Sequence, residues 1–127
     1  MLLATADPDL RISLELLFDG QPGVQIVGTA SEGDSLCALI STTSSHLILA
    51  DWDLPGFPLP AIIDEAQQMQ PSITTLVLVN SGQGLKQAQD SGADAIVLKG
   101  TSPDRLLTVF KQLQRQIITS QETNKYE

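Results

Sequence analysis

The stretch that decides the fold is His46-Leu47-Ile48-Leu49-Ala50-Asp51-Trp52-Asp53-Leu54-Pro55-Gly56. Its apolar part, Leu47 to Ala50, predicts a short buried strand, and the Pro-Gly pair predicts a turn soon after it. Asp51 stands at the end of that strand. In an open parallel sheet, ligands bind just beyond the carboxyl ends of the strands. Asp51 is therefore a candidate nucleophile or metal ligand.

The same pattern of a short apolar run and an amphipathic segment recurs along the chain. Apolar runs predict strands at 2–6, 24–29, 47–50, 76–79 and 95–98. Helical periodicity and capping residues predict helices at 8–19, 32–42, 58–70, 83–91 and 102–118. Strands that are almost wholly apolar are buried on both faces, which requires helices on both sides of a parallel sheet. The sequence therefore predicts the α/β class, as a doubly wound (βα)5 flavodoxin-like sandwich with strand order 2-1-3-4-5.

Length, charge and cysteine content narrow the class of protein. The 127 residues fit one domain. We place that domain at 1–118 and expect a polar, disordered tail at 119–127. A net charge of −8 argues against direct nucleic-acid binding and against anionic membranes. The single cysteine, Cys37, and the lack of a membrane-length apolar run favour a cytoplasmic location.

Three stretches resemble one family, the receiver domains of two-component response regulators. Residues 51–56 resemble the phosphoacceptor strand end with its Pro-Gly turn, and residues 92–99 resemble the fifth strand ending in a lysine, here Lys99. Residues 22–30 are similar to the second strand of receivers that precede helix-turn-helix output domains. The resemblance covers roughly residues 2–118. It implies a signal-transduction role in a phosphorelay.

The resemblance also implies a chemistry for these positions. Asp51 would accept a phosphoryl group from a histidine kinase, and Lys99 would pair with that group. A magnesium ion, held by an acidic pair at the end of the first strand, would bridge the oxygens. A Ser or Thr after the fourth strand and an aromatic residue on the fifth would then complete the switch.

The acidic pair is missing where the resemblance places it. Thr5 and Ala6 occupy those two positions, and Asp7 comes one residue later. Asp7 followed by Pro8 fits a helix N-cap, although a one-residue gap would bring the Asp7 carboxylate to the pocket. Asp53 is the other residual acidic residue. We therefore expect weak magnesium binding or none, and no other cofactor.

The switch positions depart from the family as well. Asn80, followed by Ser81, stands at the Ser/Thr position, and Ile96 replaces the aromatic residue. With only Asp51 and Lys99 secure, the pocket is expected to be closed by an ion pair between them. These departures predict an atypical receiver domain, in which phosphorylation is weak or absent.

The leading interpretation is a binding module that signals through protein–protein contacts and is not an enzyme. Its contact face to a partner or output domain would lie over about 83–118, and a homodimer through the first and fifth helices is the alternative. A second interpretation is a working magnesium-dependent receiver phosphorylated on Asp51. A remote third is a phosphatase of the haloacid-dehalogenase type, whose motif resembles Asp51-x-Asp53.

Overall fold

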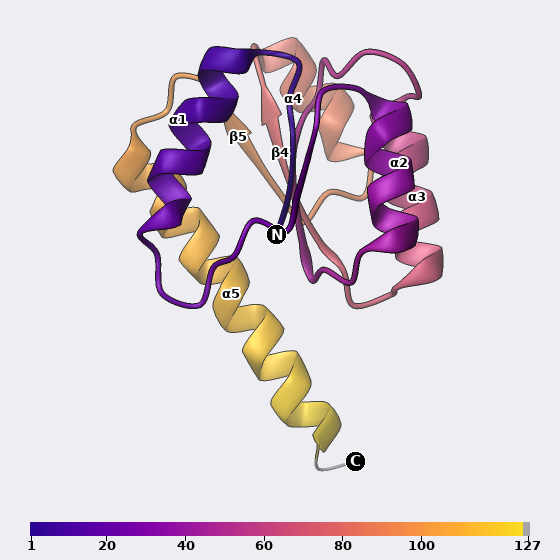
Figure 1. Ribbon diagram of the computed structural model, residues 1–127, viewed down its shortest axis with the longest axis vertical. Helices are drawn as coiled ribbons and strands as arrows, with labels where there is room; N and C mark the ends of the chain where they lie inside the picture. Colours follow the sequence, from indigo (N-terminus) through magenta and orange to yellow (C-terminus); the bar gives the residue numbers. More distant parts are fainter. Residues whose placement is uncertain (126–127) are drawn as a thin grey trace.

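The computed structural model describes residues 1–125, which form alternating strands and helices (Figure 1). The strands are β1 (Leu2–Ala4), β2 (Gly28–Ala30), β3 (Leu47–Asp51), β4 (Thr74–Val79) and β5 (Ala95–Leu98). The helices are α1 (Pro8–Asp19), α2 (Gly33–Thr42), α3 (Leu59–Met69), α4 (Gly82–Gln89) and α5 (Pro103–Lys125).

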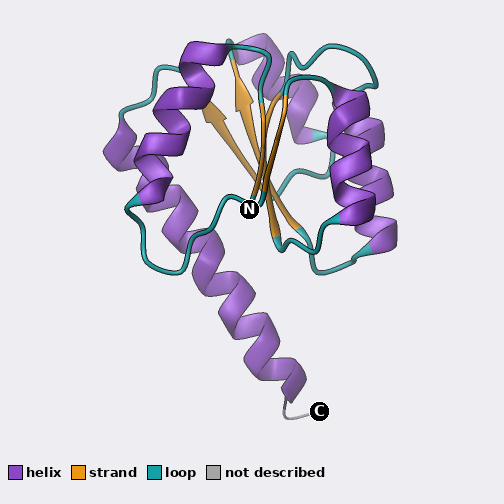
Figure 2. Ribbon diagram, viewed as in Figure 1, coloured by secondary structure: helices purple, strands orange, loops and turns teal. Residues whose placement is uncertain are grey.

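The strands form one parallel sheet in the order β2-β1-β3-β4-β5. Figure 2 shows helices on both faces of this sheet. In the register, Ala4 pairs with Ala50, and Asp51 pairs with Leu78. The predicted fold class and strand order are confirmed. The parallel arrangement brings the carboxyl ends of all the strands to one edge, which is where Asp51 lies.

Each face of the sheet has its own hydrophobic core. On one face, α1 and α5 pack against the sheet, and Phe18 contacts Phe110 with ring centroids 4.8 Å apart. On the other face, α2, α3 and α4 contribute Leu36, Ile62 and Ala88. Figure 1 shows α1 and α5 on one side of the sheet and α2 and α3 on the other. The strands between them are buried on both faces, as their apolar sequences require.

The second strand differs from the prediction of 24–29. β2 covers only Gly28–Ala30, because its ladder partner β1 begins at Leu2. The residues before Gly28 lie beside Met1, whose amino group donates to the Gln25 carbonyl (2.8 Å) and whose carbonyl accepts from the Val27 amide (3.0 Å). The predicted strand is therefore correct only at Gly28 and Thr29, and residues 24–27 precede it without regular pairing.

The last helix is longer than predicted. α5 continues to Lys125, whereas we expected it to end near 118 and a disordered tail to follow. The segment after Pro103 contains no Gly or Pro, so nothing in its backbone chemistry stops the helix. Most of the predicted tail is therefore helical, and residues 126–127 lie outside the described residues.

Candidate functional site

The candidate site lies at the carboxyl edge of the sheet, around Asp51. Asp51 is the last residue of β3 and is only 4% exposed. β1 lies directly beside β3, and Thr5 follows β1. β5 lies two strands away on the other side, and Lys99 follows it. Three strand ends thus supply one compact polar cluster.

Both oxygens of the Asp51 carboxylate accept hydrogen bonds. Oδ2 accepts from the Lys99 ammonium (2.6 Å) and from the Thr5 hydroxyl (3.2 Å). Oδ1 accepts from the backbone amide of Asp53 (3.0 Å). The Lys99 side chain is also largely buried, so the two charges form a poorly solvated ion pair. The structure brings together the two residues that the sequence singled out, and their charges cancel.

Thr5 has a structural role that sequence reasoning missed. Its side chain is 1% exposed, and its hydroxyl accepts from the Asp7 amide (3.2 Å) while donating to Asp51. From the sequence, Thr5 was only a position that had lost an acidic residue. The available signal was a hydroxyl at the end of a buried strand next to β3. Thr5 therefore connects the Asp51 carboxylate to the start of α1.

Asp7 acts as the N-cap of α1. Its Oδ1 accepts from the amides of Asp9 (3.0 Å) and Leu10 (3.3 Å), and Pro8 occupies the first helical position. These bonds satisfy amide donors that otherwise lack partners at a helix start. The side chain is exposed, and no described contact joins the Asp7 carboxylate to Asp51. Neighbouring Ala6 is exposed and has no ligand atom in its side chain.

Asp53 and Asn80 form a second, exposed pair beside the pocket. The Asn80 side-chain amide donates to Asp53 Oδ2, which joins the loop after β3 to the loop after β4. Nearby, the half-buried Trp52 donates from Nε1 to Gln87 Oε1 on α4 (3.3 Å). The Asn80 side chain therefore reaches Asp53, and no described bond carries it to Asp51.

The remaining switch positions have ordinary structural contacts. Ser81 is the N-cap of α4, and its Oγ accepts from the Gly84 amide (3.3 Å). Ile96 is partly buried and packs against the core on the α2, α3 and α4 face. An isoleucine there fills space in the core but offers no aromatic ring to turn inward.

The donor set around Asp51 does not fit a strong magnesium site. Among the side chains that the structure describes, no three His, Cys, Asp or Glu residues lie close enough together to hold a metal ion. Magnesium prefers oxygen ligands, with one or two carboxylates. Here one Asp51 oxygen is held by an ammonium and a hydroxyl, and the carboxylate of Asp53, two residues along the chain, accepts from Asn80.

Comparisons with known proteins concern the fold rather than the donor set. No family model matches the chain. The nitrate/nitrite response regulator NarL of Escherichia coli (strain K12) is 29% identical over 114 residues, which cover 88% of this chain and 53% of NarL. The receiver domain of AraT, a response regulator from Geobacillus stearothermophilus, superposes with a TM-score of 0.85 at 19% identity, covering 94% of this chain and 95% of that one. The isolated receiver domain of RcsB from Salmonella enterica serovar Typhimurium gives 0.80 at 21% identity, covering 90% and 86%.

The chain has the fold of a response regulator receiver domain. It spans about half the length of the curated relatives it matches. RcsB has also been solved as two dimers bound to DNA, and this receiver fold covers 60% of that longer chain. In the described part of the chain, no helix is both long and apolar enough to cross a membrane.

Proposed function

We propose that this receiver domain is atypical: it signals through protein–protein contacts, and Asp51 is phosphorylated weakly or not at all. It would do so without a bound cofactor and without catalysing a reaction of its own. The observation that carries the proposal is the buried hydrogen bond from the Thr5 hydroxyl to Asp51 (3.2 Å). That hydroxyl stands where the resemblance implies a metal-binding acidic pair.

The physical argument concerns charge. Phosphoryl transfer depends on stabilising the charge that develops on the transferring group, and magnesium usually supplies most of that stabilisation. In this pocket the Lys99 ammonium would have to stabilise that charge, and it already pairs with Asp51 at 2.6 Å. An attacking Asp51 would have to give up that ion pair and the Thr5 bond. Slow or absent phosphoryl transfer follows.

Protein contacts are the proposed output. RcsB has been solved as dimers bound to DNA. For this chain the proposed contact is with a partner or output domain over about 83–118, and the alternative is a homodimer through α1 and α5. Leu98, at the end of β5 and within 83–118, is 44% exposed. The net charge of −8 disfavours direct contact between this domain and a phosphate backbone. Any DNA contact would then belong to a separate output domain or partner.

One observation favours the working receiver as a second candidate. Asp51 and Lys99 keep the pairing that a phosphoacceptor pocket uses, and Asp53 lies beside them. Magnesium at high concentration would then need to displace Asn80 from Asp53. The phosphatase interpretation has no such support, because the described residues contain no cluster of acidic side chains around Asp51.

The test is phosphoryl uptake from acetyl phosphate with magnesium, followed by intact-protein mass spectrometry. The wild-type chain is expected to stay unmodified over the time in which an ordinary receiver domain is labelled. Variant Thr5→Asp combined with Ala6→Asp should gain labelling, and adding Asp51→Asn should abolish that gain. Rapid labelling of the wild type on Asp51 would overturn the proposal and support the working receiver.

A further inference from the structure

The outer side of α1 exposes two large apolar side chains. Leu16 is 73% exposed and Ile12 is 50% exposed, and they lie one helical turn apart. Single exposed apolar residues are normal on a soluble protein, but a contiguous patch usually marks an interaction site. These two form a ridge along the helix rather than isolated positions.

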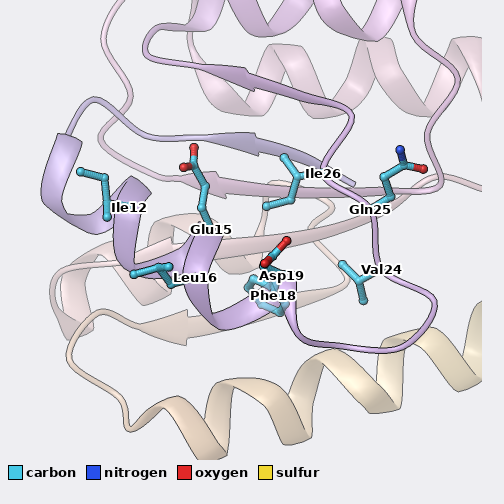
Figure 3. Close-up of a pocket in the computed structure, with 8 residues that line it drawn as sticks. All are labelled: Ile12, Glu15, Leu16, Phe18, Asp19, Val24, Gln25 and Ile26. Atoms are coloured by element: carbon cyan, nitrogen blue, oxygen red, sulfur yellow. The ribbon is translucent and has the colours of Figure 1, made fainter.

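A hollow of about 540 Å³ lies beside this ridge. Figure 3 shows Ile12 and Leu16 on α1 and Val24 and Ile26 on the segment that leads into β2. The buried ring of Phe18 also lines it. The hollow is therefore an apolar groove between a helix and an extended segment at the β2 edge of the sheet.

The charged side chains that line the groove are both acidic. They are Glu15 and Asp19. Glu15 has only a long, exposed contact with Arg11 (3.8 Å), and Asp19 has no ion pair among the described side chains. A second copy of the chain would bring the same carboxylates and another net charge of −8. Repulsion of this kind disfavours self-association and favours a basic occupant.

We propose that this groove, lined by Ile12, Leu16, Val24, Ile26, Glu15 and Asp19, binds a basic amphipathic helix of a partner protein. The apolar stripe of such a helix, with side chains at i and i+4, would pack against Ile12 and Leu16. Its Lys or Arg residues would lie against Glu15 and Asp19. The Asp51 pocket is at the carboxyl edge of the sheet and contributes nothing to the groove, so this proposal stands whatever the state of Asp51.

The test uses a synthetic peptide of leucine and lysine, about 14 residues or four helical turns long, with the leucines on one face. Binding is mapped by amide chemical shifts of the ¹⁵N-labelled chain in about 0.15 M salt, where long-range attraction is screened beyond about 8 Å. A peptide of the same composition with the leucines scattered is the control. Shifts are expected along α1 and residues 24–26, and the scattered peptide should bind more weakly.

Two variants and two matched controls identify the site. Leu16→Ser should weaken peptide binding about tenfold, and Asp19→Asn should weaken it by a smaller factor. Met69→Ser and Asp90→Asn change exposed residues of the same kinds on α3 and after α4, and they should leave binding unchanged. Shifts centred on another face, or equal losses in the controls, would overturn the proposal. So would a concentration-dependent dimer of the chain that Leu16→Ser abolishes, because the occupant would then be a second copy.

Discussion

Asp51 and Asp53 are two residues apart in the sequence, yet their carboxylates have opposite surroundings. Asp51 is 4% exposed and is surrounded by the Lys99 ammonium, the Thr5 hydroxyl and the Asp53 amide. The Asp53 side chain is exposed, and its described partner is the amide of Asn80. Burial, rather than residue type, decides which of the two carboxylates depends on its partners.

The two carboxylates also differ in what their contacts contribute to the stability of the fold. The buried carboxylate is fixed by groups from three strand ends, so its contacts help to hold the carboxyl edge of the sheet together. The exposed carboxylate joins two loops and can exchange its partner for water at little cost. Variants that remove one partner at a time can test this contrast.

The largest effect is expected from Lys99→Met. It leaves the Asp51 carboxylate buried without its counter-ion, which should lower the free energy of unfolding by about 3 kcal/mol. Urea denaturation followed by circular dichroism measures the loss. The double variant Asp51→Leu with Lys99→Met should recover much of the stability, because no charge is then buried. A single variant as stable as the wild type would show that the ion pair is better solvated than its burial indicates.

Thr5→Val should have the next largest effect. The substitution keeps the side-chain shape but removes a hydrogen bond to a charged group and the acceptor for the Asp7 amide, with an expected loss of about 2 kcal/mol. The matched control is Thr74→Val, at a buried threonine of β4 whose hydroxyl forms no described hydrogen bond. The same urea experiment compares them, and equal losses would contradict the role given to Thr5.

Asn80→Ala should change the free energy of unfolding by less than about 0.5 kcal/mol, because both side chains of the Asn80–Asp53 hydrogen bond are exposed. The expected result is a urea midpoint close to that of the wild type. A loss as large as that of Thr5→Val would mean that the two carboxylates are not as different as their exposure suggests.

Cys37 extends the comparison to a partly buried group that is influenced by acidic side chains. Burial raises the pKa of the Cys37 thiol, and the negative charges of Glu65 and Asp34 raise it further. At a given pH, less of the thiol is then ionised, and only the thiolate reacts. Iodoacetamide at mildly alkaline pH should alkylate Cys37 more slowly than it alkylates glutathione. Glu65→Gln should speed the reaction slightly, and no change in either comparison would contradict the assigned causes.

The fold could be predicted because its signals are local and repeated. The apolar runs at 47–50, 76–79 and 95–98 lie within β3, β4 and β5, and their lack of polar alternation indicated a parallel sheet with two covered faces. Boundaries were less predictable where pairing decides them, as in the late start of β2. The end of α5 was misplaced because a polar composition alone does not end a helix.

The candidate site could be predicted only in part. Asp51 and Lys99 could be paired from the sequence because Asp51 ends one strand, Lys99 follows another, and the resemblance to receiver domains implies that both lie in one pocket. The Thr5 hydroxyl bond joins side chains 46 positions apart, and its existence depends on a rotamer that no sequence pattern specifies. The capping role of Asp7 was one of two open alternatives, and the hydrogen bonds to its own helix decided it.

Direct magnesium titration tests the central claim, that Thr5 has replaced a metal ligand in the Asp51 pocket. Trp52 adjoins Asp51 and is half-buried, so its fluorescence should report on magnesium entering the pocket. The account predicts a flat titration for the wild type and a saturable change for the variant Thr5→Asp with Ala6→Asp. In that variant, magnesium should also offset the repulsion between the new carboxylates and Asp51 and raise the urea midpoint. A saturable response of the wild-type chain that Asp51→Asn abolishes would contradict the claim.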